Sequence, residues 1–314
     1  MTLTQLSAFV LVARLGSVKA AATVLGVSEP AVSQALSALR SHLGDQLLSR
    51  SGPGMTLTTG GSRLLGIASQ MVALGAEAEA AVRVAQGAPE QLRMVATSTI
   101  AEFVATPLVD TFTGRAGGAV EASCGVASGA EMPVLVTNRM ADLALGPNLT
   151  DANAGLVSEP IFRCKLIAVA SARFRLRGGM GKATWLVDAS ATDPGSPTSR
   201  LLVRLGVPES RIRVFPNQTA AWAAAADGAG VAPAVAHLVA HQVRRGELAV
   251  VETAATPIET RWYATTLPPD RRPVAAGSLR HFLSTPEAMQ LMKAPGTGVP
   301  PSRFRPPVYV TIWS

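Results

Sequence analysis

The segment VKAAATVLGVSEPAVSQAL, at residues 18–36, has the pattern of two short helices joined by a tight turn. Two helices that cross at a steep angle need a small residue where they touch, and Ala22 supplies it. Gly26 suits the turn because glycine adopts a positive φ without strain. Ser28 is a good N-cap for the second helix, and Pro30 is acceptable in its first turn. Three apolar residues are expected to hold the second helix against the first: Val27, Val32 and Leu36. The segment therefore predicts a helix-turn-helix.

The outward face of the second predicted helix carries polar groups that suit close approach to DNA. Most of them are short, whereas a helical hairpin with no role in DNA binding usually presents longer charged residues. Two interpretations of Glu29 stay open, because a carboxylate at a helix start either caps the helix or accepts a hydrogen bond from a cytosine amino group. The predicted DNA-contacting residues of this helix are Ser28, Glu29, Pro30, Ser33, Gln34, Ser37 and Arg40.

Helical and extended patterns flank this segment on both sides. Five apolar residues lie at helical spacing before it: Leu3, Leu6, Phe9, Val10 and Ala13. After it, Gly44 ends the second helix, and two short extended pieces follow at residues 46–50 and 55–58. Residues 51–54, SGPG, form a tight turn between these pieces. The pattern predicts a small hairpin, or wing, that completes an N-terminal domain.

Residues 61–86 are predicted to form one long helix with an apolar seam. Its members recur by three and four, and we expect the dimer contacts at Leu64, Ile67, Met71, Leu74 and Ala78. Because the helix lies between two domains, a single chain would leave this seam exposed, which favours pairing with a second chain. The alternative is a helix packed on its own domain.

Residues 6–61 resemble the N-terminal domain of LysR-type transcriptional regulators. The matching positions are Phe9, Ala13, Gly16-Ser17, Ala21-Ala22, Leu25, Val27-Ser28, Pro30-Ala31-Val32-Ser33, Leu36, Leu39, Leu43-Gly44, Leu47, Arg50, Leu57-Thr58 and Gly60-Gly61. The resemblance extends more weakly to about Leu291. The chain departs from the family at Glu29, Arg40 and Leu48, where the family often has Gln, Glu and Phe.

The resemblance implies roles for particular residues and partners. It places Ser33 and Gln34 in the major groove, and it brings Arg50, at the base of the wing, to a phosphate. A solvated surface charge is the alternative for Arg50. The resemblance also implies that Thr58 caps the long helix and that the chain binds double-stranded DNA as a homodimer or homotetramer.

The C-terminal part of the chain alternates short aliphatic strands with helical stretches. The expected strands are 92–96, 120–124, 143–145, 166–170, 185–187, 211–215, 248–251 and 262–265, and the expected helices are 103–112, 130–138, 199–205, 219–226 and 279–291. This alternation favours parallel sheets wrapped by helices, and the length suits two small lobes. The family resemblance implies an α/β domain of two lobes, similar to periplasmic binding proteins, with a ligand cleft at the hinge.

The predicted organisation has four parts. They are an all-α winged helix-turn-helix domain at 1–60, a dimerising linker helix at 61–88, a two-lobed effector-binding domain at 89–293 and a Pro-rich tail at 294–314. The first lobe takes about 91–162 and 266–293, and the second takes about 163–265.

Hydroxyl-rich segments stand at two predicted helix starts, one expected in each lobe. Free N–H groups and a partial positive charge at a helix start suit an anion, so we expect a small organic anion, a carboxylate, between the lobes. Ordinary capping and turn chemistry is the alternative for each residue. The predicted effector-binding residues are Thr97, Ser98, Thr99, Ser128, Pro147, Ser196, Thr198, Gln218 and Pro233.

Composition limits the class of protein. The chain is 48% apolar and 16% charged, which is typical of globular proteins, and its net charge of +7 is compatible with nucleic acid without requiring it. We see no signal peptide at the N-terminus, and the Ala- and Val-rich stretch 220–240 is a poor membrane span because it holds Asp227 and Pro233. Two cysteines are too few for a disulfide scaffold, so we expect a cytoplasmic protein.

A redox switch at Cys124 and Cys164 is one alternative, because Arg163 and Lys165 flank Cys164 and positive charges lower the pKa of a thiol. Small buried cysteines are commoner, so we expect the two cysteines to be structural.

A pair of histidines four residues apart, His237 and His241, suggests a metal pair on one helix face, but no third ligand lies nearby in the sequence. We expect no metal and no cofactor. The rival class is an enzyme or a transport-binding protein built on the two-lobed part. The sequence has no nucleophile elbow, P-loop, dinucleotide fingerprint or zinc motif, so it predicts a regulator and not an enzyme.

Overall fold

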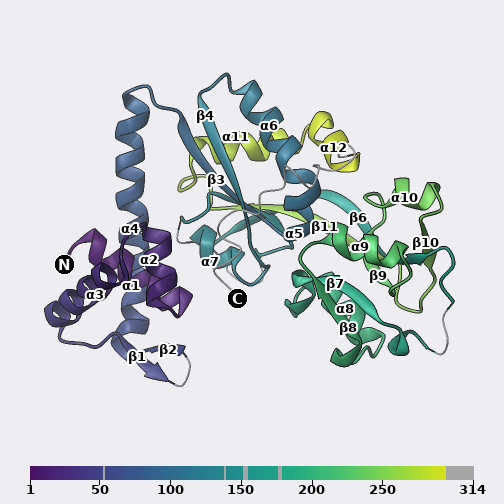
Figure 1. Ribbon diagram of the computed structural model, residues 1–314. Helices are drawn as coiled ribbons and strands as arrows, with labels where there is room; N and C mark the ends of the chain where they lie inside the picture. Colours follow the sequence, from purple (N-terminus) through teal and green to yellow (C-terminus); the bar gives the residue numbers. More distant parts are fainter. Residues whose placement is uncertain (52–53, 138, 151–154, 176–178, 295–314) are drawn as a thin grey trace. The chain divides into compact units, whose positions relative to one another are not determined.

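The computed structural model describes residues 1–51, 54–137, 139–150, 155–175 and 179–294 (Figure 1). The predicted tail lies outside these residues, except for its first, Ala294. Contacts divide the chain at Pro89 into an N-terminal unit and an effector unit.

The N-terminal unit consists of four helices and one hairpin. Their bounds are α1 Leu3–Leu15, α2 Val18–Leu25, α3 Glu29–Leu43, β1 Leu48–Ser51, β2 Gly54–Leu57 and α4 Thr59–Ala85. The caps follow from the sequence: the Ser28 side chain accepts from the Ala31 N–H at the start of α3, and Gly44 ends α3 with a positive φ of 67°. Gly26, in the turn before α3, has a φ of 66°. The all-α winged helix-turn-helix is confirmed.

The core of this unit joins α1 to the helix-turn-helix and to the start of α4. Phe9 of α1, Leu36 and Leu39 of α3 and Ala68 of α4 are buried in one cluster. Side chains of α3 at helical spacing therefore fill the inside, and the other face of the helix is left to solvent.

The effector unit is built on a seven-stranded sheet with the order β10-β6-β11-β5-β3-β4, with β9 also paired to β6. The strands are β3 Glu90–Ala96, β4 Val120–Val126, β5 Leu143–Gly146, β6 Val157–Ser171, β9 Ala232–Val235, β10 Leu248–Val251 and β11 Ile258–Thr266. Two further parallel strands, β7 Trp185–Asp188 and β8 Ile212–Phe215, form a small sheet.

Strands β6 and β11 run antiparallel through both lobes. From Tyr263 onward β11 pairs with β5 in the first lobe, whereas Val157–Ser171 reaches from the first lobe to β9 and β10 in the second. The sequence pattern predicted only residues 166–170 of this long strand. The domain and lobe boundaries given above stay predictions.

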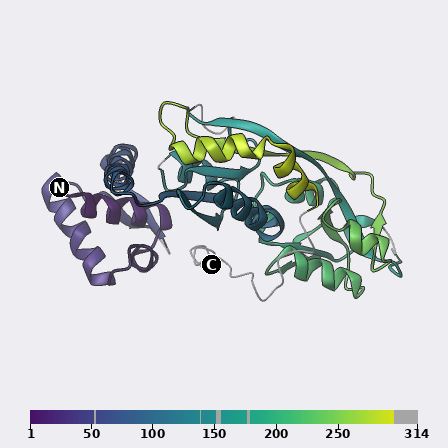
Figure 2. The same cartoon turned by 90° about the horizontal axis from the view of Figure 1, so that it is seen from above.

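The first lobe packs helices on both faces of its strands. Leu92 and Met94 of β3 share a cluster with α6 Thr106–Arg115, α11 Val274–Leu283 and α12 Pro286–Lys293, whereas Val95 packs on the other side with α7 Met132–Thr137. Strand alternation produces this division. Figure 2 shows α11 and α12, in yellow, alongside the sheet.

One predicted helix of the first lobe is wrong in extent. The stretch 279–291 is divided between α11 and α12, which begins at Pro286 with Thr285 as its N-cap. A proline at the first helical position starts a new helix because its ring restricts the preceding residue to extended backbone.

The second lobe has the same alternation along β6. Ala168 and Ala170 face the cluster that includes α8 Pro197–Arg204, and Val169 faces the cluster of α9 Gln218–Ala226. The short helix α10 Ala240–Arg244 precedes β10. Among the described residues, no helix is long and apolar enough to cross a membrane.

Candidate DNA-binding surface and effector site

The outward face of α3 is polar and exposed. Val32 and Leu36 are buried against the core as predicted, but the prediction for Val27 is wrong, because its side chain is 48% exposed. Val27 belongs to the turn. Its backbone N–H donates to the Ala22 carbonyl and so joins the turn to α2, whereas its side chain points to solvent. Six of the predicted DNA-contacting residues lie on the exposed face: Ser28, Glu29, Pro30, Ser33, Gln34 and Ser37.

Arg40, whose predicted contact with DNA stays a prediction, also has partners within its own unit. Its guanidinium turns toward the wing, where Nε donates to the Gln46 carbonyl at 2.8 Å and Nη2 donates to the Leu48 carbonyl at 3.3 Å. The side chain therefore ties the end of α3 to the first strand of the hairpin. Arg50 lies on β1 opposite Met55, and its side chain is outside what the structure describes.

A group of contacts fixes the wing to the start of α4. The Thr58 hydroxyl accepts from the Gly61 N–H, as the family resemblance implies, and donates to the Asp45 carboxylate at 2.8 Å. Asp45 also accepts from the Leu47 N–H at 2.6 Å, and these hydrogen bonds lower the pKa of its carboxyl. A Cβ on Gly61 would stand 2.0 Å from the Leu47 carbonyl oxygen, so the close approach requires glycine.

An apolar stripe on α4 stays uncovered in the single chain. Ile67 and Leu74 are 59% and 57% exposed, and Met71 between them is also exposed. Ala81, seven residues after Leu74, continues the same heptad spacing and is exposed. Leu64 differs, because it packs partly against the core of its own unit.

In the effector unit, the first hydroxyl-rich segment meets a carboxylate of the protein itself. Ser98, at the start of helix α5 Ser98–Ile100, donates its hydroxyl to Asp188 at the end of β7. Asp188 also accepts from Ser190 Oγ at 2.6 Å and from Gln218 Nε2 at 2.8 Å. Only 1% of Asp188 is exposed. The structure therefore brings two predicted residues, Ser98 and Gln218, to a third that the sequence reasoning missed.

A second missed carboxylate lies one helical turn further along. Glu102, in the π-helical segment Ala101–Ala105, accepts from the backbone N–H groups of Gln218 and Thr219, both at 3.0 Å, and from the Thr219 hydroxyl. Burial raises the pKa of Glu102, an effect that hydrogen bonds from Thr219 and Gln218 oppose and that the nearby charge of Asp188 reinforces. The N-terminus of α9 is thus occupied by a side chain of the other lobe.

These contacts bear on the predicted anionic effector, which stays a prediction. At the first of the two helix starts on which it rests, the Ser98 hydroxyl already donates to Asp188. At the second, the Ser199 N–H donates to the Ser196 hydroxyl. One signal in the sequence was overlooked: Asp188 directly follows the apolar strand residues 185–187, where site residues of α/β sheets often stand.

Three other predicted hydroxyl residues have local structural surroundings. Ser128 and Glu131 cap the start of α7 reciprocally, because each side chain accepts from the other's backbone N–H. Ser196 accepts from the Ser199 N–H at the start of α8, and Thr198 in the first turn of that helix is buried. For Ser128 and Ser196 the observed contacts are those of helix caps.

The contacts of the two predicted prolines, Pro147 and Pro233, are with residues other than Asp188. Pro147 follows β5 and approaches Gly129, whose N–H donates to the second-lobe residue Asp193 at 3.0 Å. Pro233 lies within strand β9, and its carbonyl accepts from the Trp222 indole N–H. Thr97 and Thr99 flank Ser98 and are partly buried.

The cysteines lack the features of a redox switch. Burial raises the pKa of both Cys124 and Cys164 to about 12, so both thiols stay protonated at neutral pH. They lie on β4 and β6, with three strands between them. At roughly 4.8 Å per strand spacing the two residues are too far apart for a disulfide.

The two histidines do not share a helix face. His237 precedes α10 and packs edge-on against Phe162 and Trp262, whereas His241 lies within the helix. Burial lowers the pKa of His237. No group of three possible ligands for a metal occurs among the described residues.

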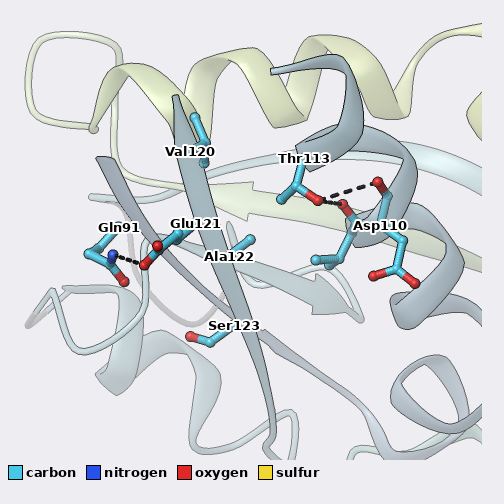
Figure 3. Close-up of a pocket in the computed structure, with 8 residues that line it drawn as sticks. Gln91, Asp110, Thr113, Val120, Glu121, Ala122 and Ser123 are labelled. Atoms are coloured by element: carbon cyan, nitrogen blue, oxygen red, sulfur yellow. Dashed lines mark hydrogen bonds between the residues drawn. The ribbon is translucent and has the colours of Figure 1, made fainter. Parts of the chain in front are cut away.

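A shallow surface depression lies elsewhere in the first lobe, between α6 and β4. Figure 3 shows its lining: Gln91, which donates to Glu121 at 2.6 Å, lies on one side of β4, and Thr113 and Asp110 of α6 lie on the other. None of the predicted effector-binding residues lines it.

The two units match two families. Residues 3–62 match the family described as "Bacterial regulatory helix-turn-helix protein, lysR family", and residues 85–285 match "LysR substrate binding domain". The chain is 34% identical to an uncharacterized HTH-type transcriptional regulator of Mycobacterium tuberculosis over the full length of both. It is 30% identical to the HTH-type transcriptional regulator CfxR of Cupriavidus necator, with 90% of this chain and 91% of that one covered.

Solved structures of low sequence identity have the same fold. A full-length AphB variant gives a TM-score of 0.60 at 18% identity, over 90% of this chain and 98% of the other. CbnR, a LysR family transcriptional regulator, gives a TM-score of 0.56 at 19% identity, over 92% of this chain and 99% of the other.

Proposed function

The chain belongs to the LysR family of DNA-binding transcriptional regulators, and we propose that its α3 reads an operator under the control of a small molecule bound between the lobes of the effector unit. The observation that carries the first half is the exposed polar face of α3. Ser33 and Gln34 stand there on a helix whose opposite face is fixed in the core. Short polar side chains on a rigid helix suit contacts to base edges in the major groove.

We propose that the α4 stripe joins two copies of the chain. Ile67, Met71 and Leu74 expose apolar side chains at coiled-coil spacing, and among the described residues of their own unit nothing buries them. Pairing with a second chain removes this surface from water, and it presents two copies of α3 to one duplex. Pairs of dimers are a further assembly that the same family supports.

For control by a ligand, the supporting observation is the set of hydrogen bonds between the lobes. Ser98 and Glu102 of the first lobe hold Asp188, Gln218 and Thr219 of the second. A ligand that exchanges these contacts for its own shifts the angle between the lobes, because it binds one arrangement better than the other. In this proposal the effector unit binds its ligand and does not catalyse a reaction. The protein acts in the cytoplasm, where its DNA is.

The test is a gel shift of the full-length chain on the DNA upstream of its own gene. The parent should bind this DNA in preference to an unrelated duplex of equal length, and a ligand found by thermal-shift screening should change that preference. Equal binding to both duplexes would contradict the proposal.

A further inference from the structure

Two buried carboxylates, Asp188 and Glu102, lie near each other between the lobes without a counter-charge. Asp188 is 1% exposed and Glu102 is 7% exposed. Among the described residues, the donors that reach them are neutral: hydroxyls of Ser98, Ser190 and Thr219, the Gln218 amide and two backbone N–H groups. Within the part of the chain that the structure describes, neither carboxylate is in an ion pair.

Buried charges of one sign are costly unless a group of opposite sign accompanies them. Here the two negative charges also repel one another, which is one reason why the pKa of Glu102 is raised. Each carboxylate accepts three of the roughly four hydrogen bonds that its lone pairs allow. Each carboxylate can therefore accept one more hydrogen bond.

An independent observation at the same place also calls for a donor. Gln218 is 4% exposed, and its amide oxygen Oε1 is buried with no hydrogen-bond partner. The Nε2 atom of the same amide donates to Asp188 at 2.8 Å, so the unpartnered oxygen lies beside the carboxylates. A buried acceptor left without a donor is unfavourable by about 1–3 kcal/mol, and in native structures it is commonly met by a water or a ligand.

We propose that the effector carries a cationic nitrogen group, an ammonium or an amidinium, which binds between the lobes with Asp188 and Glu102 as counter-charges and Gln218 Oε1 as a neutral acceptor. This proposal rests on the proposed function, in which the ligand binds between the lobes. A carboxylate ligand is disfavoured there, because it meets two like charges and must first displace Asp188 from Ser98.

The occupant is a ligand that parts the lobes as it enters. All three acceptors are nearly covered, and Phe103 of the first lobe stacks on Trp222 of the second at 5.0 Å between ring centroids. Entry of the cation therefore disturbs this stacking. A Trp222→Phe variant, compared with the parent, isolates the contribution of this indole to the fluorescence of a chain with four tryptophans.

The experiment titrates the full-length chain with methylammonium and with guanidinium chloride, following tryptophan fluorescence and thermal stability at constant ionic strength. Sodium chloride and sodium acetate are the matched controls. We expect saturable binding of the two cations with midpoints on the order of millimolar, as suits probes of two and four heavy atoms, and no saturable effect of acetate.

Two isosteric variants locate the probe. Asp188→Asn and Glu102→Gln should each raise the midpoint on the order of tenfold or more, because each removes one charge-assisted partner. Asp227→Asn is the control, since it removes an exposed carboxylate at the far end of the same helix, α9. If Asp188→Asn fails to fold by circular dichroism, Glu102→Gln decides alone.

Cation binding that is unchanged in both variants would overturn the assignment. Saturable binding of acetate but of neither cation would also overturn it, and would leave an effector site between the lobes intact. The proposed function fails by a different result, namely the absence of preferred DNA binding by the parent chain.

Discussion

Replacing Arg40 by alanine separates a structural role of this residue from a role in DNA binding. In the structure its guanidinium donates to two carbonyls of the wing strand and the turn before it, at 2.8 and 3.3 Å. Hydrogen bonds from a charged group contribute about 1.5–3 kcal/mol when buried, but one of these is exposed and the other partly buried. We therefore expect a loss of about 1–2 kcal/mol in local stability.

Hydrogen exchange of the full-length chain measures this loss where it occurs. A decrease of about 1–2 kcal/mol makes the amides of the wing exchange roughly 5–30 times faster. The salt dependence of DNA affinity should stay unchanged, because the guanidinium is engaged within the protein. Arg50→Ala, at a residue that the family resemblance places on a phosphate, should instead lower the slope of log affinity against log salt by about 0.9. If Arg40→Ala lowered this slope equally and left exchange unchanged, the internal role of Arg40 would be refuted.

Three further predictions concern the other parts of the molecule. Met71→Asp should dissociate the dimer and weaken operator binding, as measured by light scattering and gel shift, because it places an unpaired charge in an apolar seam; Gln70→Asp, next to it and off the seam, should change neither. Glu102→Gln should stabilise the effector unit increasingly as pH rises above the ordinary carboxyl pKa of 4.5, because the raised pKa of the folded state means that ionisation weakens folding; thermal melts from pH 4 to 8 check this, and a constant difference would contradict it. Replacing Cys124 and Cys164 by serine should leave DNA binding equally insensitive to micromolar peroxide, because both thiols are protonated; a peroxide response that disappears in the variant would show that one of them is reactive.

Local signals in the sequence predicted the elements that carry the DNA-binding face. The caps and turn residues act through their own backbone or their nearest neighbours, as Ser28, Gly26 and Gly44 do. Their roles can therefore be predicted from the sequence alone. The internal hydrogen bonds of Arg40 were missed because its partners are carbonyls in the turn and wing strand that follow the helix, and the helical pattern does not specify how closely these approach. The prediction that Val27 is buried was wrong because helical periodicity does not apply to a residue in a tight turn, so it cannot indicate which way the side chain points.

The effector site depended on contacts between residues far apart in the chain. Ser98 was predicted from a helix start and Gln218 from its expected place near the crossing of the lobes, but carboxylates that meet them come from positions 90 and 116 residues away. The same tertiary pairing is the reason for proposing a cationic ligand in place of the predicted anion, because the Ser98 hydroxyl that would be free in an isolated helix is engaged by Asp188. These contacts can be predicted only when it is known which strands and helices of the two lobes lie next to each other.

The central claim is that α3 reads DNA sequence, and the most direct measurement is the ratio of operator to unrelated-DNA affinity in the Ser33→Ala, Gln34→Ala double variant. Anisotropy titrations of the full-length chain would use a duplex enriched from random DNA by the parent. Each lost base contact should reduce the binding free-energy difference between operator and unrelated DNA by on the order of 1–3 kcal/mol. Ser41→Ala, at an exposed residue near the end of the same helix, should leave this difference unchanged. A double variant that discriminates as well as the parent would contradict the assignment of α3 to the major groove.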